Sequence, residues 1–288
     1  MVRCGCPNER PIEPGSRFQK VGNREVRAKA ELESGITELH VEVDQAGVAT
    51  RARFPLGKPD GARKVTRDET LANAKAIADA TDLPVAADLE NGFGDAPEAA
   101  AETIRLAGET AGLVGGSIED ASGDPSRPIY DFAHAVERIA AAAEAARRLP
   151  APFVLVGRAE NFLHGRPDLD DTIRRLQAFE AAGADALYAP GLSRPEDIRT
   201  LCASVGRPVN LLIGAVGANN VRLSVAQLAE LGARRISLGS ALSRAALGGL
   251  LRAAREVKER GTFGFADDAV PYDELNSIMA SSHAASSR

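Results

Sequence analysis

The sequence predicts a (β/α)₈ barrel, in which eight parallel strands close into a ring surrounded by helices. Three observations support this fold class. The length of 288 residues is typical of one such barrel. From residue 64 onward, short β-rich apolar runs alternate with amphipathic stretches rich in alanine and leucine, as parallel α/β folds require. Finally, no linker or low-complexity segment divides the chain. We expect a single domain over residues 1–288, with a helical C-terminal extension at 261–288.

The six apolar runs after residue 64 are the expected strands. They are Leu83–Asp88, Gly116–Glu119, Phe153–Arg158, Ala184–Ala189, Val209–Ile213 and Arg235–Leu238. A closed barrel needs two more strands, which must come from residues 1–63. The candidates are Glu38–Val43 and Gly47–Thr50. An open doubly wound sheet is the alternative if these two do not form.

Helix starts are indicated by the capping-box spacing, in which a Ser or Thr precedes a Glu or Gln by three residues. Three pairs have this spacing: Thr66 with Glu69, Ser193 with Glu196, and Ser224 with Gln227. Each is expected to begin a helix that packs outside the sheet.

Composition excludes several classes of protein. The formal net charge of −5 argues against nucleic acid as a partner, because phosphate binding requires a basic face. No apolar run approaches the roughly 18 residues that indicate a membrane span, and no signal-peptide pattern is present. Cys4, Cys6 and Cys202 form no disulfide framework. These observations favour a cytoplasmic protein.

Acidic side chains follow three successive expected strands. Asp88 and Glu90 follow the first, Glu119 the second, and Arg158 with Glu160 the third. In a parallel barrel the active site lies at this edge, so the side chains are expected to meet. Clustered carboxylates repel one another, and a hard cation such as Mg²⁺ relieves that repulsion. The alternative is that the acids are solvated loop residues or helix caps.

Two further features of these strand ends favour a bound anion. Arg158 offers the two-pronged hydrogen-bonding geometry that a carboxylate or phosphonate accepts. Gly92 lets the backbone turn tightly and approach a ligand, so it is a candidate substrate-binding residue.

The same three segments resemble the isocitrate lyase/phosphoenolpyruvate mutase superfamily. They read Ala-Asp-Leu-Glu-Asn-Gly-Phe-Gly at 87–94, Ser-Ile-Glu-Asp at 117–120 and Gly-Arg-Ala-Glu-Asn at 157–161. Residues 56–61 and 180–186 are also similar to segments of that family, and the loop after Asp120 resembles that of a poorly characterised bacterial branch. The resemblance covers roughly residues 55–280 and implies a barrel.

For the metal, the resemblance implies Mg²⁺ as the cofactor. Asp88 would bind the ion directly, and Glu90 and Glu119 would hold its water molecules. For the substrate, it implies a small anionic carboxylate or phosphonate. Arg158 would bind the anionic end, Glu160 would orient Arg158, and Asn210 would contact the substrate.

Asp60 would be a polar catalytic group over the substrate, by the same resemblance. Family members make or break C–C or P–C bonds beside a carboxylate. The resemblance also implies a homo-oligomer, either a dimer or a tetramer.

Two departures from the family bear on the reaction. The segment 121–128 contains no Cys, Lys or His, although the lyases carry a Lys-Lys/Arg-Cys-Gly-His loop there and the phosphonomutases a lysine and an asparagine. Residues 1–55 lack the family's first two strand-end motifs, as after a replaced N-terminus or a shift of reading frame. The leading hypothesis is a Mg²⁺-dependent lyase-like enzyme for a small 2-oxo or 2-hydroxy carboxylate. A phosphonate P–C bond enzyme and a catalytically weak relative with only a binding role are the alternatives.

Two further candidates each have two interpretations. His164, in the segment after the fifth strand of the expected barrel, is either an acid/base group at the mouth or a surface residue. Residues 237–240 are either an anion-binding turn at a helix N-terminus or only a turn eased by glycine.

Overall fold

Six parallel strands form one sheet, and their order in the sheet follows their order in the chain. The computed structural model describes residues 65–81, 83–214 and 221–278. The strands are β1 (Ala86–Asp88), β2 (Gly115–Glu119), β3 (Val154–Arg158), β4 (Ala186–Tyr188), β5 (Val209–Leu212) and β6 (Arg235–Ser237). All six expected strands are therefore confirmed, to within a few residues at their ends.

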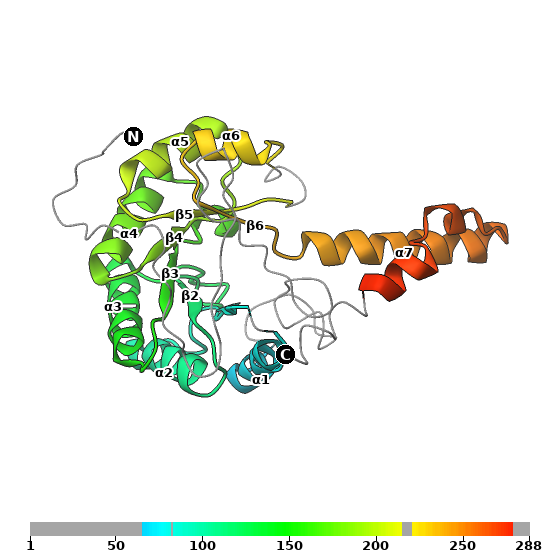
Figure 1. Ribbon diagram of the computed structural model, residues 1–288. Coiled ribbons are helices and arrows are strands. Elements are labelled where there is room, and N and C mark those ends of the chain that lie inside the picture. Colours follow the sequence, from blue (N-terminus) through cyan, green and yellow to red (C-terminus); the bar gives the residue numbers. More distant parts are fainter. Residues whose placement is uncertain (1–64, 82, 215–220, 279–288) are drawn as a thin grey trace, which may run out of the picture.

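This strand order indicates a TIM-like fold. A doubly wound sheet reverses its strand order at a switch point, whereas this sheet runs from β1 to β6 without reversal. Figure 1 shows the strands curving as part of a barrel wall. The expected strands Glu38–Val43 and Gly47–Thr50 lie outside the described residues, so closure into an eight-stranded barrel stays a prediction.

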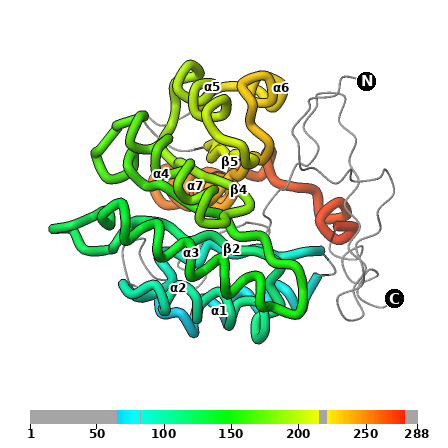
Figure 2. The backbone as a smooth tube through the Cα atoms, turned by 90° about the vertical axis from the view of Figure 1, so that its left-hand side faces the viewer, coloured from blue at the N-terminus to red at the C-terminus, as the bar shows by residue number. Residues whose placement is uncertain are grey.

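Six helices cover the outer face of the curved sheet (Figures 1 and 2). They are α1 (Arg67–Asp79), α2 (Pro97–Glu109), α3 (Phe132–Arg148), α4 (Leu169–Ala182), α5 (Pro195–Ser204) and α6 (Val225–Glu230). A short 3₁₀ helix, η1 (Asn161–His164), follows β3. Each helix buries its apolar face against the strands, which leaves its polar residues facing solvent.

The core lies between this helical layer and the sheet. Its fully buried side chains come alternately from helices and strands, and include Ile104, Ile139, Leu155, Leu176, Phe179, Leu187 and Ile198. Burial of side chains of this size stabilises the fold by roughly 1.5–3 kcal/mol each. This packing fixes the strands, and with them the residues at the strand ends.

Two of the three expected capping boxes are present. In α1 the Glu69 amide donates to Thr66 Oγ1 and the Thr66 amide donates to Glu69 Oε2. In α6 Ser224 and Gln227 exchange the same two bonds.

The expectation at Ser193 and Glu196 was wrong. Helix α5 begins at Pro195, so Arg194 is the residue before the helix and no side chain caps it. Proline lacks an amide proton and suits the first helical position, which moves the start of the helix one residue past the expected one. Glu196 instead accepts from Arg194 Nε at 2.6 Å.

The chain leaves the sheet after β6 through α7 (Ala241–Arg260), which points away from the other helices in Figure 1. No residue of α7 is buried, and its leucines at 247, 250 and 251 are exposed. A 3₁₀ helix, η3 (Gly264–Asp268), follows it. Residues 279–288 lie outside the described part, and the C-terminal extension as a unit stays a prediction. None of the described helices is long and apolar enough to cross a membrane.

Candidate active site

The strand register brings the acidic strand ends together. Asp88 pairs with Ser117, and Glu119 pairs with Arg158. Asp88, Glu119 and Arg158 are the last residues of β1, β2 and β3, respectively. Because neighbouring parallel strands end at the same edge, these side chains emerge side by side, as expected.

Arg158 lies at the centre of this group. Its Nη1 is 2.8 Å from Asp88 Oδ2, and its Nη2 is 3.1 Å from Glu119 Oε2. Glu160 Oε1 accepts from both Nη2, at 2.6 Å, and Nε, at 3.0 Å. The side chain of Arg158 is only 3% exposed. We call Asp88, Glu119, Arg158 and Glu160 the strand-end cluster.

The strand-end cluster carries a net negative charge. Burial alone would lower the pKa of Arg158, but the nearby carboxylates of Asp88, Glu160 and Glu119 outweigh burial and raise that pKa well above its usual value. Arg158 is therefore always charged. One positive and three negative groups leave the cluster two charges short of neutrality, which favours a further cation.

An aromatic ring completes the surroundings of Arg158. The guanidinium carbon lies 4.9 Å from the ring centre of Tyr188, the last residue of β4. This cation–π contact holds the guanidinium plane in one orientation. Apart from its position at a strand end, no sequence feature indicated Tyr188.

The loop between β1 and α2 has an unusual backbone. Glu90 and Phe93 have positive φ values of 50° and 60°, which non-glycine residues rarely adopt. The Glu90 amide donates to Asp88 Oδ1 at 3.0 Å, so the turn is fixed by the candidate metal ligand itself. Glu90 lines a cavity of about 480 Å³ together with Arg67 and Asp95. Strained backbone of this kind clusters at functional sites.

Gly92 has a packing reason to be glycine. Its φ is +77°, and a Cβ added there would lie 2.7 Å from the Cα of Ala100 in α2. Its carbonyl accepts from Thr103 Oγ1 at 2.8 Å. The loop therefore sits directly on α2, and a role of Gly92 in binding substrate stays a proposal.

Asn210 is the second residue of β5, which continues to Leu212. The side chain is buried. It donates to Ser237 Oγ at 3.0 Å and accepts from Arg235 Nη1 at 2.8 Å. Both its bonds reach β6, so a contact between Asn210 and substrate stays a prediction.

The remaining candidates are less informative. Asp60 lies outside the described residues. His164 is exposed at the end of η1. Ser237 is buried and accepts the bond from Asn210, and Gly239 has a positive φ of 51° as a tight turn requires. The anion-binding role of residues 237–240 stays untested.

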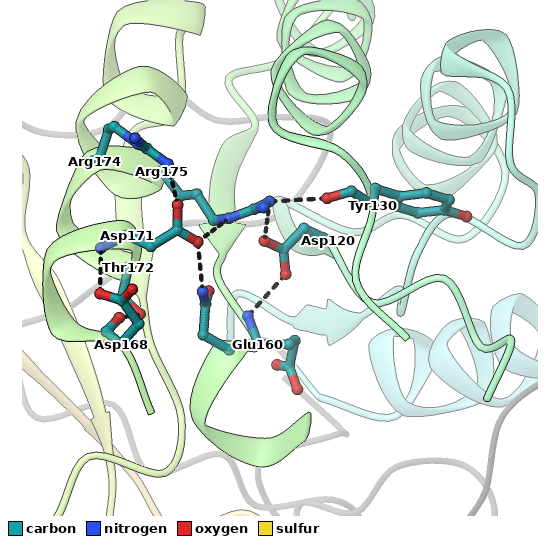
Figure 3. Close-up of polar contacts among 9 residues, drawn as sticks. Asp120, Tyr130, Glu160, Asp168, Asp171, Thr172, Arg174 and Arg175 are labelled. Carbon is teal, nitrogen blue, oxygen red and sulfur yellow. Dashed lines mark hydrogen bonds and ion pairs between the residues drawn. The ribbon is translucent and has the colours of Figure 1, made fainter. Parts of the chain in front are cut away.

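Sequence reasoning missed a buried polar network behind the strand-end cluster (Figure 3). Asp120 Oδ1 accepts from the Glu160 amide at 2.8 Å, and its Oδ2 lies 3.1 Å from Arg175 Nη1. Burial raises the pKa of Asp120 to about 7, although the Glu160 amide and Arg175 oppose that rise. A signal was available in the sequence, because Arg175 falls in the apolar stripe of α4 with Leu176 and Phe179.

A second buried arginine, Arg138 in α3, was also missed. Its Nη1 donates to the carbonyls of Gly94 at 2.8 Å and Ala96 at 3.2 Å, and its Nη2 donates to the carbonyl of Asn91. Its guanidinium carbon lies 4.5 Å from the ring centre of Tyr130. Arg138 therefore holds the β1–α2 loop from behind, by donating to several of its carbonyls.

The segment after Asp120 closes on itself. Ala121 and Ile129 form an antiparallel bridge, and the Ser122 amide donates to the Pro128 carbonyl at 2.9 Å. Inside this loop the Asp124 amide donates to Ser122 Oγ at 2.9 Å. It is a compact hairpin-like loop without a thiol, amine or imidazole that could transfer a proton.

The strand-end cluster fits a magnesium ion, by the chemistry of its donors. No three His, Cys, Asp or Glu side chains converge as a ready-made metal site within residues 65–278 as described. Mg²⁺ does not require such a site, since it commonly binds one or two carboxylates and keeps several waters. Asp88 and Glu119 offer carboxylates that remain partly exposed, at 25% and 15%.

The chain belongs to the phosphoenolpyruvate phosphomutase family, whose model matches residues 45–258. This places it in the isocitrate lyase/phosphoenolpyruvate mutase superfamily and among its carbon–carbon lyase-like enzymes. The fold and the strand-end motifs had indicated the same superfamily.

Relatives of known sequence agree with this assignment. The chain is 33% identical over 223 residues to an uncharacterised protein of Mycobacterium tuberculosis (strain H37Rv), covering 77% of this chain and 78% of that protein. It is 32% identical over 205 residues to an oxaloacetate decarboxylase of Bradyrhizobium diazoefficiens, covering 69% and 65%.

Solved structures extend the comparison. A crystal structure described as a lyase/mutase from Burkholderia cenocepacia J2315 is 51% identical, with a TM-score of 0.75 over 82% of this chain and 84% of that one. The structure of 2,3-dimethylmalate lyase is 25% identical, with a TM-score of 0.66 over 80% and 82%. Together the comparisons indicate lyase/mutase chemistry.

Proposed function

We propose that the protein is a Mg²⁺-dependent lyase that acts on a small 2-oxo or 2-hydroxy carboxylate. The observation that carries this proposal is the strand-end cluster, in which an arginine and three carboxylates meet at the carboxyl edge of the sheet. The 32% identity to an oxaloacetate decarboxylase supports a 2-oxo acid as the substrate class.

In this proposal Asp88 binds the metal and Glu119 and Glu90 hold its water molecules. A bound Mg²⁺ would polarise the substrate's oxygens and stabilise the negative charge that develops when a bond beside the carbonyl breaks. The strand-end cluster has the excess negative charge that this cation would balance.

Arg158 binds the substrate carboxylate in this proposal. Its Nη1 lies beside Asp88 and its Nη2 beside Glu119, while Glu160 accepts from both Nε and Nη2. Glu160 thereby fixes the direction in which the guanidinium points, and Tyr188 fixes its plane. A guanidinium prepared in this way loses less conformational entropy when an anion binds.

Asp60 and Asn210 complete the proposed site. Asp60 is proposed as the polar catalytic group over the substrate, and Asn210 and Gly92 as substrate contacts. Because the loop 121–129 contains no thiol, amine or imidazole, any proton that the reaction requires must come from another group, for which Asp60 is the candidate.

A phosphonate P–C bond enzyme is the second candidate, favoured by the family match to phosphoenolpyruvate phosphomutase over residues 45–258. Its weakness is the loop after Asp120, which has neither the lysine nor the asparagine of the phosphonomutases. The two candidates share the strand-end cluster and differ in the bond that is broken.

The test is calorimetric titration of Mg²⁺ and of oxalate, a mimic of the enolate, each alone and together. We expect oxalate to bind only when Mg²⁺ is present, and this binding to disappear in Asp88→Ala. Asp197→Ala is the matched control, because Asp197 is a comparably exposed carboxylate paired with an arginine outside the site. No oxalate binding at millimolar concentration, or equal binding in Asp88→Ala, would refute the proposal.

The same preparation separates the two bond types. Incubation with oxaloacetate, followed by measurement of pyruvate and carbon dioxide, reports C–C cleavage. Incubation with phosphonopyruvate, followed by phosphorus NMR, reports P–C chemistry. Binding of oxalate without turnover of either compound would indicate a relative that retains only a binding role.

A further inference from the structure

A buried ion pair lies behind the strand-end cluster and reaches it through the backbone. Asp120 and Arg175 are 2% and 7% exposed. Asp120 follows Glu119 at the end of β2, whereas Arg175 lies in α4, outside the sheet. Neither side chain belongs to the proposed metal or substrate contacts, so the proposed chemistry does not account for them.

Asp120 fixes the backbone on which Arg158 and Glu160 are carried. Its Oδ1 accepts the Glu160 amide at 2.8 Å, and its own amide donates to the Arg158 carbonyl at 3.2 Å. The backbone leaving β3 is therefore held at two points by one residue. These bonds set the point from which the Glu160 side chain reaches Arg158.

Arg175 fixes Asp120 in turn. Its Nη1 is 3.1 Å from Asp120 Oδ2 and donates to the Tyr130 carbonyl at 3.0 Å. Its Nε donates to Asp171 Oδ2 at 2.8 Å, one turn earlier in α4. Figure 3 shows these bonds as a chain that runs from α4 through Asp120 to the backbone of Glu160.

Stability alone is a weak explanation for such a pair. The cost of removing two charges from water often exceeds the gain from their attraction, so that apolar side chains of the same volume would stabilise a fold equally well. Hydrogen bonds of a charged pair, however, fix the orientation of the groups they join, which apolar contacts do not. Here the group held in this way is the amide of Glu160.

We propose that Asp120 and Arg175 form a positioning pair, which sets the backbone of Glu160 so that Glu160 and Arg158 together present the guanidinium to an anionic substrate. The inference rests on the proposed function, because it assigns Arg158 to substrate binding. Neither residue touches the substrate. Both act through the hydrogen bond from the Glu160 amide to Asp120.

The test compares Asp120→Leu, which removes the acceptor of the Glu160 amide, with Arg175→Met and their double variant in the full-length protein. Hydrogen-bond partners of metal ligands typically change metal affinity or activity by about 10- to 100-fold when they are removed, and a partner that orients Arg158 is comparable. We expect each single variant to bind oxalate, in the presence of Mg²⁺, more weakly by about that factor. We expect the double variant to lose no more than the worse single variant, because the two residues act on the same bond.

Leu201→Ala in α5 is the control for loss of stability. Leu201 is fully buried and belongs to the core away from the strand-end cluster. We expect it to lower the melting temperature while leaving oxalate affinity unchanged. The positioning pair is refuted if the Asp120 and Arg175 variants keep wild-type affinity for oxalate, as expected for Leu201→Ala. It is also refuted if the fold-loss of affinity in the double variant is the product of the two single losses.

Hydrogen exchange at the peptide containing Glu160 provides a readout that needs no ligand. We expect faster exchange of the Glu160 amide in Asp120→Leu and Arg175→Met and unchanged exchange in Leu201→Ala. If the wild-type protein binds no oxalate, the proposed function fails. The exchange rates then still test whether Asp120 and Arg175 position the backbone of Glu160. Unchanged exchange in all three variants would refute it.

Discussion

The guanidinium of Arg158, at the end of β3, reaches past β2 to lie 2.8 Å from Asp88 Oδ2, at the end of β1. One side chain thus joins the outer two of three neighbouring strands. It also supplies the counter-charge for a carboxylate that is proposed to bind metal. Arg158 and the proposed divalent cation would therefore stabilise the same carboxylates.

Arg158→Met should make stability depend more strongly on Mg²⁺. Removing one partner of a buried ion pair costs about 3–5 kcal/mol, because the remaining charges lose their compensation. We expect a large fall in the melting temperature without metal and a larger recovery on adding Mg²⁺ than the wild type shows. Calorimetric melting with and without Mg²⁺ measures both. Equal recovery in the two proteins would contradict shared stabilisation.

Arg138→Met should destabilise the protein and loosen the β1–α2 loop. The change removes the donor to carbonyls of residues 91–96, of which that of Asn91 is buried, at a cost of about 1–3 kcal/mol for each buried group that remains unsatisfied. Denaturant unfolding gives the free energy, and hydrogen exchange at residues 89–96 gives the local effect. Arg148→Met, an exposed change in the same helix, should leave both nearly unchanged.

Comparing Gly92→Ala with Gly112→Ala separates backbone strain at a positive φ from a steric clash of the added Cβ. Both glycines have a positive φ, of 77° and 70°, which costs a residue with a Cβ roughly 1–2 kcal/mol. Only Gly92 has a neighbour at 2.7 Å, whereas nothing lies within 4 Å of a Cβ at Gly112. We expect a clearly greater loss of unfolding free energy for Gly92→Ala. Equal losses would show that the loop moves away from α2 at little cost.

Asp171→Asn should reduce the loss of stability in acid. Burial raises the pKa of Asp171, but hydrogen bonds from Arg175 and Asn161 outweigh it, so the net pKa is lowered in the folded state. Such a group stabilises the fold above its unfolded pKa of about 3.9 and loses that contribution as pH falls through its folded pKa. The melting temperature of both proteins, measured from neutral pH down to pH values below the folded pKa of Asp171, tests whether the variant loses less stability in acid. Asp170→Asn, its exposed neighbour, should keep the wild-type acid dependence.

Leu250→Asp in α7 should change the oligomeric state, if the expected homo-oligomer forms through this helix. Leu247, Leu250 and Leu251 are exposed on a helix of 20 residues in which nothing is buried. Contiguous exposed apolar surface of this kind marks interaction sites. Light scattering after size exclusion should show a dimer or tetramer for the wild type and a smaller species for the variant. Arg252→Asp, an exposed position on the opposite side of the same helix, serves as control.

Much of this fold was predictable because strands and helices have different periods. All six strands after residue 64 follow from short apolar runs, and two capping boxes follow from spacing alone. Ser193 failed because a proline two residues later determines where α5 starts. The meeting of Asp88, Glu119, Arg158 and Glu160 was predictable as well, since parallel strands end at one edge.

The supporting network was not predicted because buried arginines contradict the simple pattern of polar and apolar faces. Arg138 and Arg175 occupy positions that the helical period assigns to the core. Their partners are backbone carbonyls and an aspartate distant in sequence, which only the folded chain brings near. A charged residue inside an apolar stripe is therefore a sign of a buried network.

The bridge between Ala121 and Ile129 has a consequence for protein engineering. Because this bridge and the bond from the Ser122 amide to the Pro128 carbonyl close the loop, the end of β2 and the segment before α3 meet at a narrow neck. A longer segment could be inserted between these two residues without changing the sheet. Replacing the loop between Ala121 and Ile129 by one with a cysteine or histidine would add the proton donor that residues 121–129 lack.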